Sequence, residues 1–225
     1  NVRRRPVLAL DEMLPSPVWV QVDCSKVLFL RTQLCLWEPV RPDFQVDRIP
    51  WHQQTWDALE SLPLWSDEIP LGFTFYTDGT VSRQQDAAAA AVVLIVTTQQ
   101  GPRWGGYATA SNLGIASAPR AEATALFLAL RWLRQLLCHT ATPQPWIELA
   151  FDCAPVAGAA SGTHGITTNA DLLIVLRALV QWLEAVSQRS FAWQHIPSHK
   201  GHPWNEAADV LCRQALRTGC YTTDM

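Results

Sequence analysis

The sequence is poor in charged residues and contains no long apolar run. Only 16% of the 225 residues are charged, and the net charge is −3 with a pI near 6.1. This balance excludes a protein that holds a polyanion by overall basicity, so any such contact must be local or depend on a bound cation. The apolar runs are short and interrupted, and the start Asn-Val-Arg-Arg-Arg-Pro has no apolar signal region. We therefore expect a soluble chain that does not bind a membrane.

The cysteines do not follow a spacing typical of a metal site or of a disulfide-stabilised fold. The six cysteines are scattered along the chain without a Cys-x-x-Cys pair. This spacing argues against a zinc ribbon and against a disulfide framework, and it favours a reducing compartment. We expect an intracellular protein, of the cytoplasm or the nucleus, that forms part of a longer chain.

Residues 1–70 differ from the rest of the sequence. They hold eight of the fifteen prolines and five of the eleven tryptophans. Proline at this density breaks helices and central strands, so we predict only short strands at 18–22 and 27–37 and one helix at 55–62. The predicted organisation is an N-terminal extension or connecting segment of unknown fold at 1–70, a domain at 71–220 and a tail at 221–225.

After residue 70 the pattern is typical of strands joined by tight turns. Strands are predicted at 72–78, 88–98 and 103–110, and the short connections favour an antiparallel meander. Asp78-Gly79 is expected to end the first strand, and Gln99-Gln100-Gly101-Pro102 the second.

Helices alternate with strands in the rest of the chain. Helical periodicity predicts helices at 119–138, 170–186 and 203–217, and apolar runs predict strands at 145–152 and 190–196. A stretch of small residues and a Gly-rich loop at 161–165 separate the fourth strand from the second helix. The order predicts an α/β domain with a mixed five-stranded sheet and helices on both faces.

Four acidic residues occupy informative positions in this layout: Asp78, Glu122, Asp152 and Asp209. Asp-Gly alone is more typical of a hairpin turn, and Glu in a first helical turn normally complements the helix dipole. Glu122, however, shares its helical face with core leucines, and Asp152 closes a strand that is apolar on both faces. A buried carboxylate without a partner costs several kcal/mol, which a divalent cation would offset.

The donor set indicates which cation this would be. Oxygen ligands without cysteine suit Mg²⁺ or Mn²⁺. Two such ions about 4 Å apart can hold the attacking and leaving oxygens of a phosphodiester. The sequence therefore predicts metal-assisted hydrolysis, with the ions supplying the positive charge that the chain lacks.

The stretch His199-Lys-Gly-His-Pro-Trp-Asn-Glu-Ala-Ala-Asp209 closely resembles the signature of type 1 ribonucleases H. Three further motifs, in the family's order, resemble the same family: Tyr76-Thr-Asp78-Gly79-Thr80, Arg120-Ala-Glu122-Ala-Thr-Ala-Leu126 and Phe151-Asp152. The resemblance spans residues 73–220. It implies a ribonuclease H fold and cleavage of the RNA strand of an RNA:DNA hybrid.

The resemblance also implies roles for single residues. Asp78 would bridge two ions, Asp209 would hold the ion that activates water, and Glu122 with Asp152 would hold the other. His199, beside Gly201, would help proton transfer and product release. Substrate contacts would come from four residues: Gly79, Thr80, Ser117 and Asn205. Contacts to the 2′-hydroxyl would include backbone groups near Gly79 and the Glu122 carboxylate.

Three departures from the family pattern concern the grip on substrate. Ala118-Pro119 replaces the asparagines that often precede the Arg-Ala-Glu segment, and Asp152-Cys153-Ala154 replaces Asp-Ser-Gln. Only Ser187-Gln-Arg-Ser190 joins the second helix to the fifth strand, so a basic protrusion is lacking. These features are similar to ribonucleases H embedded in retroelement polyproteins, where a reverse transcriptase domain would deliver the hybrid.

Other interpretations stay open at the level of sequence. The domain could be a catalytically silent module that only packs against a partner or binds nucleic acid, or a transposase or integrase of the same superfold. A zinc site could form from His195, His199 and His202, although Pro197 forbids a regular helix there. Glu206 could serve only its helix terminus, and three tryptophans are expected in the core: Trp132, Trp182 and Trp193.

Overall fold

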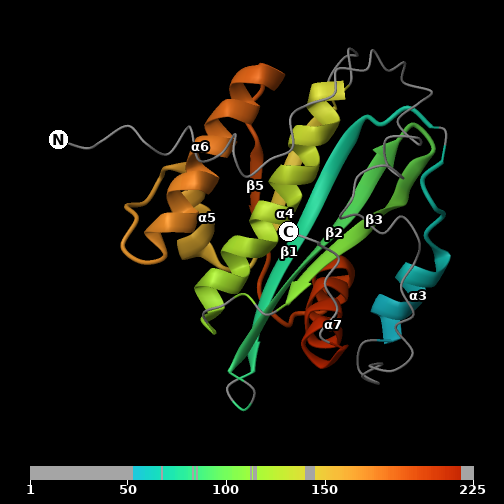
Figure 1. Cartoon of the computed structure of the whole chain (residues 1–225). Coiled ribbons are helices and arrows are strands. Elements are labelled where there is room, and N and C mark those ends of the chain that lie inside the picture. Colours follow the sequence, from blue (N-terminus) through green and yellow to red (C-terminus); the bar gives the residue numbers. More distant parts are fainter. Residues whose placement is uncertain are drawn as a thin grey trace.

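The computed structural model describes residues 53–66, 68–82, 84, 86–111, 113, 116–139 and 145–218 (Figure 1). The strands predicted at 18–22 and 27–37 lie outside these residues. The described elements are, in order, α3 (Gln53–Ser61), β1 (Gly72–Ser82), β2 (Ala87–Thr98), β3 (Gly101–Ser111), α4 (Ala118–His139), β4 (Trp146–Phe151), α5 (Ala154–Ser161), α6 (Ala170–Ser187), β5 (Ala192–His195) and α7 (Pro203–Thr218).

The sheet has five strands in the order β3-β2-β1-β4-β5. β1 pairs with β2 and β2 with β3 in antiparallel fashion, whereas β4 runs parallel to both β1 and β5. The chain passes from the edge strand β3 to β4, which lies beside β1, through the crossover helix α4. β4 runs parallel to its neighbour β1, and a hairpin cannot place a parallel strand. The predicted mixed sheet, with an antiparallel meander and a helical crossover, is confirmed.

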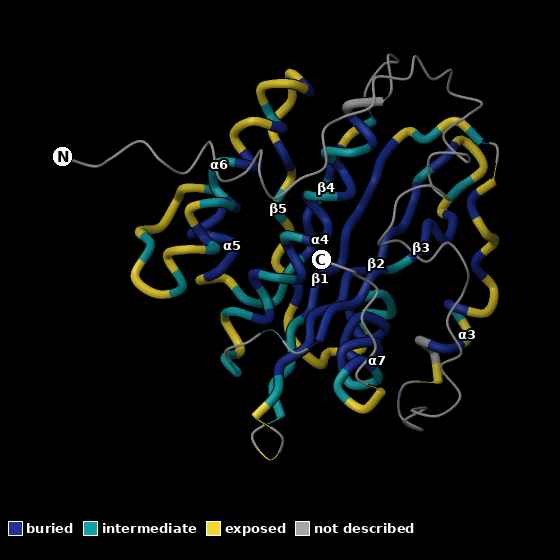
Figure 2. Tube along the Cα trace, viewed as in Figure 1, coloured by how far each residue is buried: buried dark blue, intermediate teal, exposed yellow. Residues whose placement is uncertain are grey.

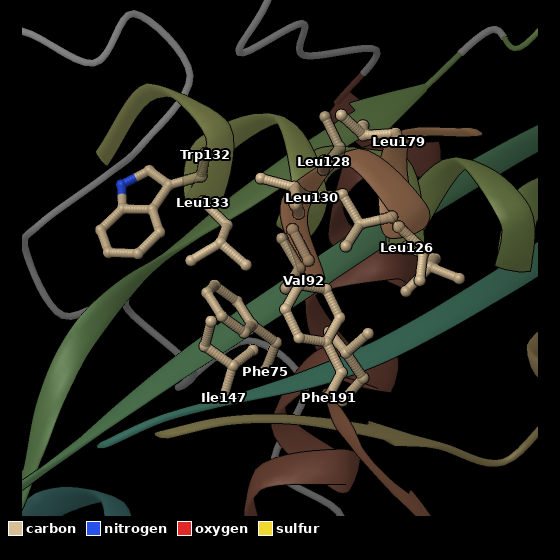
Figure 3. Packing of buried hydrophobic residues seen from close by; sticks show 14 of the residues in the cluster. Phe75, Val92, Leu126, Leu128, Leu130, Trp132, Leu133, Ile147, Leu179 and Phe191 are labelled. Carbon is tan, nitrogen blue, oxygen red and sulfur yellow. The ribbon is translucent and has the colours of Figure 1, made fainter. Parts of the chain in front are cut away.

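Helices cover both faces of the sheet, as predicted. α4 packs on β1 and β2, with α5 and α6 beside it, while α7 packs on the other face of β1, β2 and β3 (Figure 1). Side chains alternate between the two cores: Phe75 and Val92 join the α4 side, and Tyr76 and Val93 join the α7 side. Figure 3 shows Phe75, Val92 and Leu133 meeting between the sheet and α4. In Figure 2 the buried residues, in dark blue, are concentrated in the central strands and in the helices packed against them.

Two predicted strand ends are wrong. β1 does not end at Asp78-Gly79 but continues to Ser82, because its last residues pair with the alanines that open β2. Gly101 and Pro102 belong to β3 and not to the turn. Pro102 is tolerated because β3 is an edge strand, where a missing backbone donor leaves no ladder bond unmade.

The described part of the first 70 residues packs on the domain. The helix predicted at 55–62 forms as α3, and Trp56 is buried beside α7. Trp104 of β3 exchanges backbone hydrogen bonds with this segment, accepting from the Trp65 nitrogen at 2.9 Å and donating to the Pro63 carbonyl at 2.8 Å. This pairing covers part of an exposed sheet edge.

Two of the three tryptophans expected in the core pack against it, and one does not. Trp132 is buried against Phe73 and Phe75, and Trp193 is half-buried. Trp182 of α6 is 40% exposed, with the guanidinium of Arg134 from α4 over its ring, so the prediction for Trp182 is wrong. Across the described residues, no helix combines the length and apolar character needed to cross a membrane.

Candidate active site

Two acidic residues lie side by side because of the register of the parallel strands. The pairing of β1 with β4 ends at Tyr76 and Ala150. Asp78 and Asp152 each stand two residues further on, at the carboxyl ends of this paired region. Crevices at the carboxyl ends of neighbouring strands are the usual place for ligands in α/β sheets.

The first turn of α4 brings a third carboxylate to the same place. Ser117 caps this helix: its hydroxyl accepts a hydrogen bond from the Arg120 nitrogen at 3.2 Å. The turn lies directly on Gly79, where a Cβ would stand 2.3 Å from the Glu122 nitrogen and 2.5 Å from the Ala121 carbonyl carbon. Only glycine fits here, and its backbone N–H also donates to the Glu122 carboxylate.

Asp78, Glu122 and Asp152 form one close group. Each offers a carboxylate oxygen, and these oxygens lie within 4.8 Å of one another. Burial raises the pKa of Glu122, and the neighbouring carboxylates of Asp78 and Asp152 raise it further. Burial and the carboxylates of Asp209 and Asp152 likewise raise the pKa of Asp78. The group is therefore short of positive charge, which is the property expected of a cation site.

Asp209 lines the same pocket from α7 but belongs to a second group. Its ligand oxygen lies within 4.8 Å of ligand atoms from His199 and Glu206. Its carboxylate is also paired with Arg213, one helical turn further along α7. Burial raises the pKa of Asp209, and the charges of Arg213 and His199 oppose that rise.

His199 lies on the loop between β5 and α7. Its side chain is 66% exposed, and its Nδ1 is 3.9 Å from Oδ2 of Asp209. The backbone at His199 has a φ of +53°, and that at Gly201 a φ of +80°. The Gly201 nitrogen donates to Oε1 of Glu206 at 3.1 Å, so the buried Glu206 holds the loop against the start of α7.

The other sequence-predicted residues divide into two pairs. Gly79 and Thr80 line the pocket, beside the metal-holding candidates. Ser117 and Asn205 are not among the described lining residues. The Ser117 hydroxyl accepts a hydrogen bond as helix cap, and Asn205 is only 3% exposed within α7.

Sequence reasoning missed Arg213, Cys153 and Ser198, which all line the pocket. Arg213 could have been found, since the spacing of four residues from Asp209 puts both on one helical face. The sequence favours a role for Glu206, three residues before Asp209, at the helix terminus only, yet its carboxylate belongs to the second group. Cys153 is a free, half-buried cysteine directly after Asp152.

The alternative zinc site does not form. Within the described ranges, the three histidines considered for it share no candidate metal group. The His202 ring instead stacks on Tyr76 with centroids 5.0 Å apart, and the His195 side chain lies at the exposed end of β5. The pocket's donors are mainly carboxylate oxygens, and such a set fits Mg²⁺ or Mn²⁺ better than zinc.

The structure is an α/β domain with a mixed sheet and a pocket of carboxylates at the ends of the central strands, and these carboxylates could hold a divalent cation. Residues 71–217 match the family model of RNase H. The chain therefore belongs to the RNase H family. None of the curated protein sequences matches it.

The fold is shared with solved ribonucleases H. LC11-RNase H1, isolated from compost by a metagenomic approach, is 20% identical with a TM-score of 0.50, over 66% of this chain and 98% of that one. The same enzyme in complex with an RNA/DNA hybrid has the same identity and TM-score, over 65% and 98%. RNase H1 of the archaeon Halobacterium salinarum is 25% identical with a TM-score of 0.46, over 65% and 98%.

Proposed function

We propose that the chain is an endoribonuclease that hydrolyses the RNA strand of RNA:DNA hybrids by two-metal-ion catalysis. The observation that carries the proposal is the group of Asp78, Glu122 and Asp152, with oxygens within 4.8 Å, in a pocket that Asp209 also lines. Membership of the RNase H family and likeness to an enzyme solved with an RNA/DNA hybrid support it.

The carboxylates divide into two ligand sets. Asp78, Glu122 and Asp152 would hold one divalent ion, and Asp78 with Asp209 would hold the second. Bound there, Mg²⁺ or Mn²⁺ supplies positive charge to the phosphodiester and lowers the pKa of a water molecule. The expected products are a 5′-phosphate and a 3′-hydroxyl.

The chain's own groups would handle protons and select the substrate. The exposed His199 imidazole, 3.9 Å from Asp209, is free to rotate towards solvent and can carry a proton to or from the reacting oxygens. The backbone at Gly79 and the hydroxyl of Thr80 line the pocket and can contact a 2′-hydroxyl, which distinguishes RNA from DNA. Ser117 and Asn205 would contribute to substrate binding only after a change of side-chain position.

We further infer that a reverse transcriptase domain of the same polyprotein presents the hybrid. α6 ends at Ser187 and β5 begins at Ala192, so their connection has no room for a basic protrusion. The first turn of α4 begins with Ala118 and Pro119, which offer no side-chain donor to a phosphate. In this proposal residues 1–70 are the connecting segment and 71–220 the nuclease domain.

The test is cleavage of a labelled RNA:DNA hybrid with Mg²⁺ or Mn²⁺, beside DNA duplex, RNA duplex and single strands. We expect cleavage of the hybridised RNA only, and a loss of about 10³-fold or more in Asp78→Asn, because several kcal/mol of transition-state stabilisation is removed. Asp86→Asn, at an exposed aspartate with a φ of +47°, is the matched control and should remain active.

Two results would contradict the proposal. Activity that persists in EDTA or in Asp78→Asn would reject two-metal catalysis. Absence of cleavage on every substrate, even with a reverse transcriptase domain supplied in trans, would favour the silent packing module.

A further inference from the structure

Arg213 and Asp209 form a fork-like ion pair inside the pocket. The Arg213 Nε donates to Oδ1 of Asp209 at 3.1 Å, and its Nη2 donates to Oδ2. Both carboxylate oxygens are therefore engaged by one guanidinium. The Asp209 side chain is only 9% exposed, whereas the Arg213 side chain is 41% exposed.

The other carboxylates of the pocket have no such partner. Of its described lining residues, Arg213 is the one with a permanent positive charge. It forms its ion pair with Asp209, and its charge also reaches Asp78, whereas no cationic side chain of the described lining pairs with Glu122 or Asp152. The two parts of the pocket thus differ in how their negative charge is balanced: one by an arginine and one by whatever cation binds.

We propose that Arg213 is a built-in competitor for the second metal ion, occupying Asp209 until that ion displaces it. This inference rests on the proposed two-ion function. A metal ion on Asp209 needs at least one of the oxygens that the guanidinium engages, and a dication and a guanidinium repel each other at this range. We therefore expect the Arg213 guanidinium to leave Asp209 when the ion binds.

The surroundings of Arg213 allow this movement. Its exposed side chain can rotate into solvent at the pocket mouth, whereas Asp209 is fixed by burial in α7. The ion pair is partly exposed, so water screens it. The free energy that a competing ion needs to break the pair is therefore moderate. Arg213 is accordingly a positioning residue that lowers the affinity of the ion on Asp209 more than the affinity of the ion held by Glu122 and Asp152.

Isothermal titration calorimetry of the full chain with MnCl₂ alone tests this. We expect two affinities in the wild type. In Arg213→Gln, the weaker affinity should tighten by about fivefold to tenfold, while the stronger one should change by less than about twofold. Arg213→Lys, which keeps the charge but cannot fork, should fall between the two. Arg217→Gln, which removes the same charge from the exposed end of the same helix, is the control and should change neither affinity.

An unchanged or weakened second affinity in Arg213→Gln would overturn the proposal, since the arginine would then be neutral towards the ion or support it. The same change in Arg213→Gln and in Arg217→Gln would also overturn it, because net charge alone would be the cause. Hybrid cleavage is measured separately. If the weaker MnCl₂ affinity tightens in Arg213→Gln but the wild type cleaves no hybrid, the proposed function is wrong and the proposed role of Arg213 is supported.

Discussion

Gly79 lies so close to the first turn of α4 that a Cβ on it would stand 2.3 Å from the backbone nitrogen of Glu122. The contact joins the central strand to the helix that carries a candidate metal ligand. Because the clashing atoms belong to backbone, neither a rotamer change nor a small side-chain movement can relieve it. The position of the Glu122 carboxylate therefore depends on the absence of a side chain at residue 79.

Gly79→Ala is expected to move the start of α4 away from β1. Overpacking of this kind costs about 1–3 kcal/mol, and the displaced Glu122 should weaken metal binding and cleavage together. Thermal unfolding and MnCl₂ titration measure the two effects. Gly165→Ala is the matched control, because a Cβ at Gly165 meets nothing within 4 Å. Full metal affinity in Gly79→Ala would contradict the inference that this contact positions Glu122 as a ligand.

Neutralising Glu122 should stabilise the metal-free protein. Burial and nearby carboxylates raise the pKa of Glu122 in the folded state. Above the ordinary carboxyl range the unfolded chain has released its proton while the folded protein retains one, so the free energy of unfolding falls as the pH rises. Glu122→Gln removes the share of this pH dependence that Glu122 contributes. It should raise the free energy of unfolding in EDTA at neutral pH by about 1–2 kcal/mol, which corresponds to several degrees in melting temperature.

Melting curves in EDTA between about pH 5 and pH 9 measure this effect. Asp171→Asn is the control, because an ion pair with Arg120 lowers the pKa of this exposed aspartate. Its neutralisation should reduce stability slightly and not increase it. A melting temperature of Glu122→Gln at or below that of the wild type would contradict the inference that ionisation of the buried Glu122 destabilises the metal-free protein.

His199→Ala should slow turnover without unfolding the protein or emptying the metal site. The His199 side chain is exposed, and it approaches Asp209 only to 3.9 Å. We expect a loss of about tenfold to a hundredfold in kcat with an unchanged MnCl₂ affinity, since a proton carrier is removed and the ligands remain. His195→Ala, on the exposed end of β5, is the control. A loss of metal binding in His199→Ala would make His199 a ligand instead.

A basic insertion between Ser187 and Ala192 should give the isolated chain a stronger grip on its substrate. Each added phosphate contact is expected to raise hybrid affinity and to steepen its salt dependence by about 0.9 in the log–log slope. A Gly/Ser insertion of equal length is the control. If the wild type already binds an isolated hybrid as tightly as the basic variant, the inferred need for a presenting partner is wrong.

The elements with strong periodicity were predictable from the sequence. α4, α6 and α7 begin and end within two residues of the predicted helices, because each has a sustained apolar face. Asp78-Gly79 misled the prediction for β1, since this pair is a local turn signal. Pairing with the alanine run of β2 is a long-range effect, and it overrides that local preference.

The site was predictable in its carboxylates and not in their partners. The expected burial of Glu122 and Asp152, together with the order of the motifs, indicated that these two carboxylates and Asp78 would meet. The spacing of Asp209 and Arg213 shows that both lie on one helical face, but not that this face lines the pocket. Similarly, nothing in the sequence shows that the Ser117 hydroxyl caps α4 or that Asn205 is buried, because both depend on how the helices pack.

The pairing of Tyr76 with Ala150 has a consequence for how this nuclease tolerates change. Asp78 and Asp152 face one another through sheet register, and a strand displaced by a single residue turns every side chain to the opposite face. Lengthening or shortening β4 by one residue would therefore remove Asp152 from the pocket while leaving the composition of the site intact. Over evolutionary time, this part of the gene should accept substitutions far more readily than small insertions or deletions.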